Sequence, residues 1–178
     1  LSNEKPWGLI LFKRNIKSLN QIQYLTNRIK KLTNDKYFPI LIDEEGANVS
    51  RLSNIINNNI SANFFGNLYS INDKLSIKLY KNYLNLICKN LTNMGININT
   101  IPVLDILRKN TNKVIGKRSF SNRREIVKKL GLITVKQCHS NKIISVIKHI
   151  PGHGCSKSDS HFKMPQVNLS ENLLNKND

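Results

Sequence analysis

Short apolar runs alternate with amphipathic segments along this chain, and this alternation constrains the fold more than any other feature. The first two runs, Trp7–Phe12 and Phe38–Asp43, are nearly continuous, which is typical of strands buried on both faces. The predicted strands are Trp7–Phe12, Phe38–Asp43, Ile98–Asp105 and Ile143–Ile150. The segments between them are helices at Ser18–Leu32, Lys74–Asn93 and Arg123–Ser140, and a loop from Glu44 to about Asn72. This order predicts an α/β fold in which crossover helices join parallel strands.

Polar residues stand where the predicted strands end. Asp43 and Asp105 close the second and third strands, and Lys148 with His149 lies near the end of the fourth. Ligands bind at this edge of parallel α/β folds, so we expect a site there. Four strands are too few for a closed barrel of eight, so the chain is either a small open sheet or part of a barrel.

The chain is strongly basic, with 28 Lys and Arg against 11 Asp and Glu and a net charge of +17. A basic chain can bind nucleic acid or a membrane surface. The alternative is compositional drift, because Lys and Asn crowd the whole sequence and the basic residues form no single stripe. We therefore expect weak, salt-sensitive binding to polyanions and no specific nucleic-acid partner.

The cysteines and the apolar pattern indicate the kind of cellular compartment in which the chain would fold. The three cysteines, at 88, 138 and 155, are odd in number and widely spaced, which disfavours a disulfide framework and fits a reducing compartment. No run of eighteen apolar residues is present, so we expect no membrane span. No signal-peptide pattern opens the chain.

The segment KHIPGHGCSKSDSHFKMP, from Lys148 to Pro165, is the densest in chemically active residues. It holds three of the four histidines of the chain. A metal site is one interpretation, but the spacing H-x3-H-x-C-x5-H matches no established zinc pattern, and we predict no metal. The pattern of a phosphate-binding loop is absent. His153, inside PGHG, is interpreted as a structural residue that braces the loop.

Four motifs in order, LIDEEGANVSRL, GININTIPVLDI, VIGKRSF and KHIPGHGCSKSDSH, resemble the bacterial β-N-acetylhexosaminidases of glycoside hydrolase family 3. The resemblance spans nearly the whole chain, and WGLILFKRNI is similar to the family's second strand. It implies a (β/α)8 TIM barrel that cuts N-acetylglucosamine from cell-wall fragments in the cytoplasm. Residues 1–178 would then be a single partial barrel domain, roughly the front half to two-thirds, with the first strand and the last strands outside it.

The resemblance also implies roles for individual residues. The general acid/base would be His161, oriented by Asp159; an imidazole suits both steps because its pKa is about 6.5. Asp105 would order a basic group such as Arg118, and Glu44 and Glu45 have no assigned role. The residues that match the family's sugar contacts are Asp43, Arg51, Arg118, Lys148 and His149.

Two departures qualify this interpretation. The family has two glycines and an arginine where this chain has Gly46, Ala47 and Asn48, which could alter the turn behind Asp43. The family's nucleophilic aspartate lies beyond Asp178, so residues 1–178 alone are expected to be inactive.

The expected partner is a sugar substrate bound by a monomer that needs no cofactor. The alternatives are another family 3 β-glycosidase, such as a β-glucosidase, or a truncated non-catalytic remnant.

Overall fold

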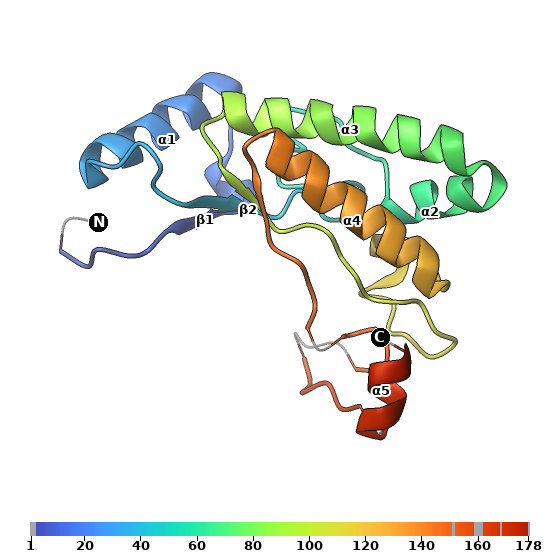
Figure 1. The fold of residues 1–178 in the computed structure, drawn as a ribbon. Coiled ribbons are helices and arrows are strands. Elements are labelled where there is room, and N and C mark those ends of the chain that lie inside the picture. Colours follow the sequence, from blue (N-terminus) through green and yellow to red (C-terminus); the bar gives the residue numbers. More distant parts are fainter. Residues whose placement is uncertain (1–2, 151, 159–161, 168, 178) are drawn as a thin grey trace.

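A computed structural model describes residues 3–150, 152–158, 162–167 and 169–177. Within these residues, four parallel strands form one sheet in the order β1-β2-β3-β4 (Figure 1). The strands are β1 (Leu9–Leu11), β2 (Ile40–Ile42), β3 (Ile98–Asn99) and β4 (Ile144–Ser145). The helices are α1 (Leu19–Thr33), α2 (Ala62–Ile71), α3 (Asp73–Asn93), α4 (Arg124–Ser140) and α5 (Glu171–Asn177), with 3-10 turns η1 (Lys13–Asn15) and η2 (Gly116–Arg118).

Local capping explains where the long helices begin. The side chains of Ser18, Ser61 and Asn72 accept hydrogen bonds from backbone N–H groups in the first turns of α1, α2 and α3. These bonds satisfy donors that have no partner inside the helix. Asn34 ends α1 in the left-handed conformation, at φ 51°. The predicted bounds of these helices are therefore close to the observed ones.

The predicted loop from Glu44 to Asn72 was wrong in its last third, because α2 occupies Ala62–Ile71. This helix contains an internal glycine and buries few of its residues, chiefly Phe65 and Gly66, so its apolar spacing is weak. The strands were predicted too long: the third ends at Asn99 and the fourth at Ser145. An apolar run in the sequence indicates that its residues are buried, and this burial continues beyond the last residue that pairs in the sheet.

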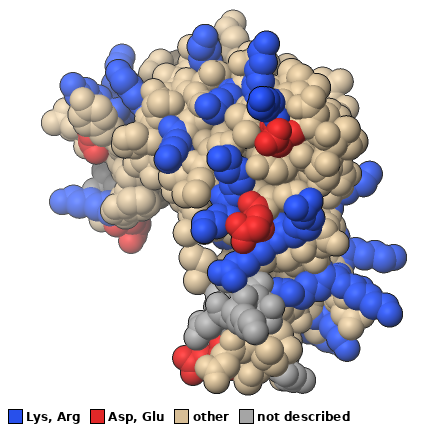
Figure 2. Space-filling view, turned by 45° about the vertical axis from the view of Figure 1, so that its right-hand side comes forward, with Lys and Arg blue, Asp and Glu red and all other residues tan. Residues whose placement is uncertain are grey.

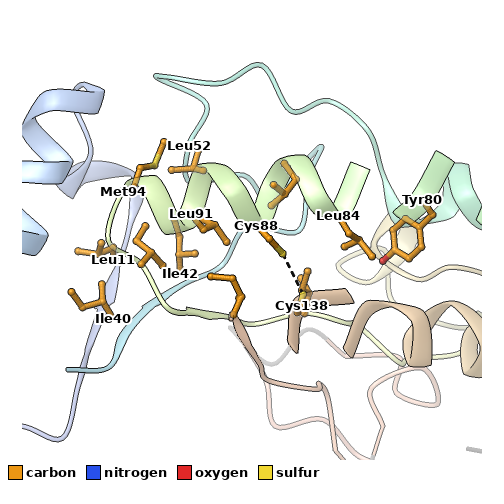
Figure 3. Packing of buried hydrophobic residues seen from close by; sticks show 14 of the residues in the cluster. Leu11, Ile40, Ile42, Leu52, Tyr80, Leu84, Cys88, Leu91, Met94 and Cys138 are labelled. Carbon is orange, nitrogen blue, oxygen red and sulfur yellow. Dashed lines mark hydrogen bonds between the residues drawn. The ribbon is translucent and has the colours of Figure 1, made fainter. Parts of the chain in front are cut away.

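The core lies between the sheet and the helices α3 and α4, and Figure 3 shows part of its packing. Aromatic rings from α2 and α3 meet there: the Phe65 and Tyr80 centroids are 4.5 Å apart. The Tyr80 hydroxyl is 2.7 Å from Thr134 Oγ1 on α4, and burial raises the pKa of Tyr80. The thiols of Cys88 and Cys138 are in contact, with a sulfur separation of 3.8 Å (Figure 3). These contacts join α3 to α4.

Helices α1, α3 and α4 cover one face of the sheet, and the opposite face is more open (Figure 1). One row of paired residues runs across the strands: Ile10, Leu41, Ile98 and Ile144. Ile10 is 43% exposed and Ile144 is 61% exposed at the two edges of this row. The expectation of burial on both faces was therefore wrong for the first strand, β1, where Ile10 is exposed. Parallel sheets are normally covered on both faces, whereas the part of the chain that the structure describes covers this face only incompletely.

The surface carries the basic character of the composition. On the face in Figure 2, Lys and Arg side chains stand at many separate places and do not form one stripe. No helix in the described part of the chain is long and apolar enough to cross a bilayer.

Candidate functional site

The polar residues predicted at the strand ends meet at one edge of the sheet. Asp43 directly follows β2, and Thr100 directly follows β3. Beyond β4, Lys148 pairs with Val103 in an isolated parallel bridge, and its N–H donates to the Pro102 carbonyl at 3.1 Å. The peptide bond between Lys148 and His149 is cis, and both side chains line the same pocket.

Asp43 is the centre of the first group of contacts. One carboxylate oxygen accepts hydrogen bonds from the Thr100 hydroxyl and from Lys148 Nζ, the latter at 3.2 Å. The other oxygen is 3.4 Å from Arg51 Nη2. Burial alone would raise the pKa of Asp43, but the Thr100 hydrogen bond and the Lys148 charge outweigh it, so the pKa is lowered. Asp43 is therefore held as a carboxylate, a good acceptor for sugar hydroxyls.

Glu45 forms a second group of contacts that sequence reasoning left without a role. Its carboxylate accepts from Arg118 Nε at 2.7 Å and from Arg118 Nη2 at 2.9 Å, and Lys148 Nζ is 2.5 Å from Oε1. Burial alone would lower the pKa of Arg118, but the bonds to Glu45 raise it. A usable signal existed: side chains two residues apart on an extended segment point to the same side, which places Glu45 beside Asp43.

Asp105 orders His149. Asp105 Oδ2 is 2.6 Å from His149 Nδ1, and Oδ1 accepts the backbone N–H of His153. Although burial favours the neutral acid, the bonds from His149 and His153 lower the pKa of Asp105. An ionised carboxylate can only accept, so His149 Nδ1 carries the proton in this bond, and Nε2 is the other ring nitrogen that a ligand could use. The basic group expected beside Asp105 is thus His149, whereas Arg118 pairs with Glu45.

His153, interpreted from the sequence as a brace for its loop, lines the pocket. Its side chain lies in the same pocket, its ring is 5.8 Å from that of His149, and the residue is only 8% exposed. Within the described residues, neither ring nitrogen has a hydrogen-bond partner. A buried imidazole normally has a partner, so this ring offers a donor and an acceptor to a molecule in the pocket or to residues that pack over it.

Glu44 organises the segment that carries Arg51. It is 1% exposed, and its carboxylate accepts from the Ser50 hydroxyl, the backbone N–H groups of Arg51 and Leu52, and Asn58 Nδ2 at 2.7 Å. These donors supply the hydrogen-bond partners that a buried carboxylate requires. Glu44 therefore has a structural role in the loop after β2.

The pocket is a cavity of about 560 Å³, within the ordinary size range of ligand sites, about 300–1,000 Å³. All five predicted sugar contacts are among its lining residues: Asp43, Arg51, Arg118, Lys148 and His149. The predicted catalytic residues Asp159 and His161 lie outside the described residues. Within the described part of the chain, no group of three or more His, Cys, Asp or Glu side chains could hold a metal ion.

The hydrogen bonds of Asp105 predict how stability depends on pH. The pKa of Asp105 is lower in the folded state than its unfolded value of about 3.9, so its stabilising effect is present above pH 3.9 and is lost as the pH falls through the folded pKa. We expect Asp105→Asn to lower the free energy of unfolding at pH 7 by about 2 kcal/mol. Its unfolding free energy should also fall less steeply below pH 4. Urea unfolding of both proteins from pH 3 to 7 tests this, and equal slopes would contradict it.

The turn behind Asp43 shows the effect of the departure at Ala47. The turn is closed by the Glu45 N–H on the Val49 carbonyl at 2.9 Å, with Gly46 at φ 95° and Ala47 at φ 46°. An alanine in the left-handed region is strained. We expect Ala47→Gly to raise the free energy of unfolding by about 0.5–1 kcal/mol. The control is Ala62→Gly, in the first turn of α2, which should lower it by up to about 1 kcal/mol. A loss of stability in Ala47→Gly would show that the turn is not strained.

The fold and the site together define a class of protein. Parallel strands in sequential order, helices on one face and a charged polar pocket at the carboxyl ends of the strands are the arrangement of an enzyme of the (β/α)8 barrel type. The glycosyl hydrolase family 3 N terminal domain matches residues 1–178, and the chain belongs to this family.

Known relatives agree with this assignment. The chain is 34% identical over 177 residues to β-hexosaminidase A of Pseudoalteromonas piscicida, covering 96% of the chain and 29% of that protein. It is 33% identical to the β-hexosaminidase of Hydrogenovibrio crunogenus, covering 88% of the chain and 43% of that protein. The chain therefore spans less than half the length of these two relatives.

Solved structures give the same result. NagZ from Neisseria gonorrhoeae superimposes with a TM-score of 0.88 at 31% identity, covering 97% of this chain and 50% of that one. Its complex with N-trifluoroacetyl-D-glucosamine superimposes with a TM-score of 0.86, also at 31% identity, covering 96% of this chain and 50% of that one. The expected TIM barrel is confirmed: the four strands described above are part of a (β/α)8 barrel.

Proposed function

We propose that the protein containing this chain is a retaining β-N-acetylglucosaminidase that removes β-linked N-acetylglucosamine from peptidoglycan-derived fragments. The observation that carries the proposal is the pocket that brings Asp43, Arg118, Lys148 and His149 together at the carboxyl edge of the sheet. The Neisseria gonorrhoeae relative was solved with an N-acylated glucosamine, which supports a sugar of this kind as the ligand.

The chemistry of the pocket suits a sugar. Carboxylates accept hydrogen bonds from ring hydroxyls, and Arg and Lys donate to sugar oxygens. We assign sugar binding to Asp43, Arg51, Arg118, Lys148 and His149. His149 would act through Nε2, because Nδ1 is bound to Asp105.

The proposed reaction has two steps. A nucleophilic carboxylate displaces the leaving group while an acid protonates the glycosidic oxygen, and water then releases the sugar from the covalent intermediate. We assign the proton transfers to His161, which donates in the first step and accepts from water in the second, with Asp159 as its orienting partner. The nucleophile is expected outside residues 1–178, in the part of the relatives that this chain does not cover. We also propose that the enzyme is cytoplasmic and monomeric.

Hydrolysis of 4-nitrophenyl N-acetyl-β-D-glucosaminide by the full-length protein tests the proposal. We expect His161→Ala to lower kcat/KM by about 10²–10⁴-fold, the usual contribution of a general acid/base. The matched control is His139→Ala, an exposed histidine in the last turn of α4, which should stay within about twofold of the wild type.

Other outcomes separate the alternatives. Faster cleavage of the β-glucoside that lacks the N-acetyl group would indicate a β-glucosidase. Binding of N-acetylglucosamine without any hydrolysis would indicate a non-catalytic remnant. An unchanged rate in His161→Ala would remove His161 from the mechanism.

A further inference from the structure

Glu45 contacts two of the five proposed sugar-binding residues and is almost removed from solvent. Its side chain is 5% exposed, and those of its partners Arg118 and Lys148 are 15% and 16% exposed. It lies in the same pocket as they do. A buried acid that contacts two cations of a binding site can determine where those cations stand.

The contact with Arg118 fixes the plane of the guanidinium group. Nε and Nη2 donate to the two oxygens of Glu45 at 2.7 and 2.9 Å, and Nη1 donates to the Val114 carbonyl at 3.1 Å. A two-point bond between arginine and a carboxylate sets the direction of the group as well as its position. Of the five N–H donors of arginine, these bonds use three, so the remaining two have directions set by Glu45.

The contact with Lys148 divides that cation between two acids. The Nζ group is 2.5 Å from Glu45, 2.9 Å from the Thr100 hydroxyl and 3.2 Å from Asp43. An ammonium group has three N–H donors, and these acceptors are equal in number. Without the Glu45 charge, Lys148 would be drawn towards Asp43 alone and would compete with sugar hydroxyls for that carboxylate.

Glu45 is itself held by the backbone. Its N–H donates to the Val49 carbonyl at 2.9 Å, and the following Gly46 pairs with Val49 in a bridge. The adjacent Glu44 points to a different set of partners, which are loop donors and not Arg118 or Lys148. The two neighbouring acids thus have separate tasks.

We propose that Glu45 is a positioning residue of the sugar site: its carboxylate orients Arg118 and shares the Lys148 cation with Asp43, so that Arg118 and Asp43 are both directed at the sugar. This inference rests on the proposed function. Glu45 acts through its two partners and needs no contact with the sugar.

A double-mutant cycle on the full-length protein tests the inference. We expect Glu45→Gln to raise KM about tenfold or more with a smaller change in kcat, because a charged hydrogen bond to each partner is lost. In an Arg118→Met background, Glu45→Gln should raise KM less than about threefold, because coupled residues are not additive. Glu45→Asp, which keeps the charge, should recover part of the loss. The charge-matched control is Glu125→Gln, an exposed acid of α4, with KM within about twofold.

A second measurement does not depend on activity. The Arg118 Nε–H signal in nitrogen-15 NMR spectra should exchange with water about tenfold faster in Glu45→Gln than in the wild type or Glu125→Gln, since its acceptor is weakened. If Glu45→Gln does not fold, Glu45→Asp, which keeps the charge on a shorter side chain, gives the same comparison with an intermediate exchange rate. Fully additive changes in KM, or an unchanged exchange rate, would overturn the inference. A wild type without hydrolysis but with the exchange difference would refute the proposed function alone.

Discussion

Replacing Gly66 by alanine is expected to lower the free energy of unfolding by about 3 kcal/mol, because the new methyl group has no space. A Cβ built on Gly66 would lie 1.7 Å from the carbonyl oxygen of Phe120 and 2.6 Å from its carbonyl carbon. Both are backbone atoms, so no rotation of a side chain can relieve the overlap. Helix α2 would have to move away from the segment that follows Arg118.

Urea unfolding of the full-length protein, followed by circular dichroism, measures this effect. The control is Asn67→Ala, at the next position of α2, whose exposed side chain bonds only to Asn63 among the contacts described. It should change the free energy of unfolding by less than about 0.5 kcal/mol. Because Phe120 is two residues from Arg118, Gly66→Ala should also weaken sugar binding. Equal stability of the two variants would show that α2 is not packed as described.

Replacing Lys148 by methionine is expected to lower kcat/KM for the N-acetylglucosaminide by about 10²–10³-fold, the usual effect of removing one partner from a desolvated charge pair. The ammonium group lies between Asp43 and Glu45, at 3.2 and 2.5 Å. Methionine fills a similar volume and removes the charge, so the two carboxylates would face each other without the cation they share.

The pH profile of kcat/KM should also change in Lys148→Met, and the direction of the change follows from the pKa of Asp43. The Lys148 charge is one of the influences that lower the pKa of Asp43, so its removal raises that pKa. The acidic limb of the kcat/KM profile should therefore move to higher pH in Lys148→Met. Lys136→Met, at an exposed position of α4, serves as the control and should retain the wild-type profile. A profile that does not move would show that Asp43 and Lys148 are not coupled.

Several parts of this fold were predictable because they depend on local chemistry. The helix predicted at Arg123–Ser140 is observed at Arg124–Ser140, and the one predicted at Lys74–Asn93 is observed at Asp73–Asn93. Caps and apolar spacing act over a few residues and can be read from a single sequence. Helix α2 was missed because Phe65 and Gly66 pack against distant segments, which no local pattern records.

The sequence by itself determined the order of the four strands and the long helices, the strand-end positions of Asp43 and Lys148, and the motifs that place the chain in glycoside hydrolase family 3. Only the tertiary structure decided which acidic side chain pairs with which basic side chain. Glu45 pairs with Arg118 across 73 positions, and Asp105 pairs with His149 across 44. Such pairs depend on how loops from different strands converge at the edge of the sheet, and Coulomb attraction acts on distance in space and not on distance along the chain.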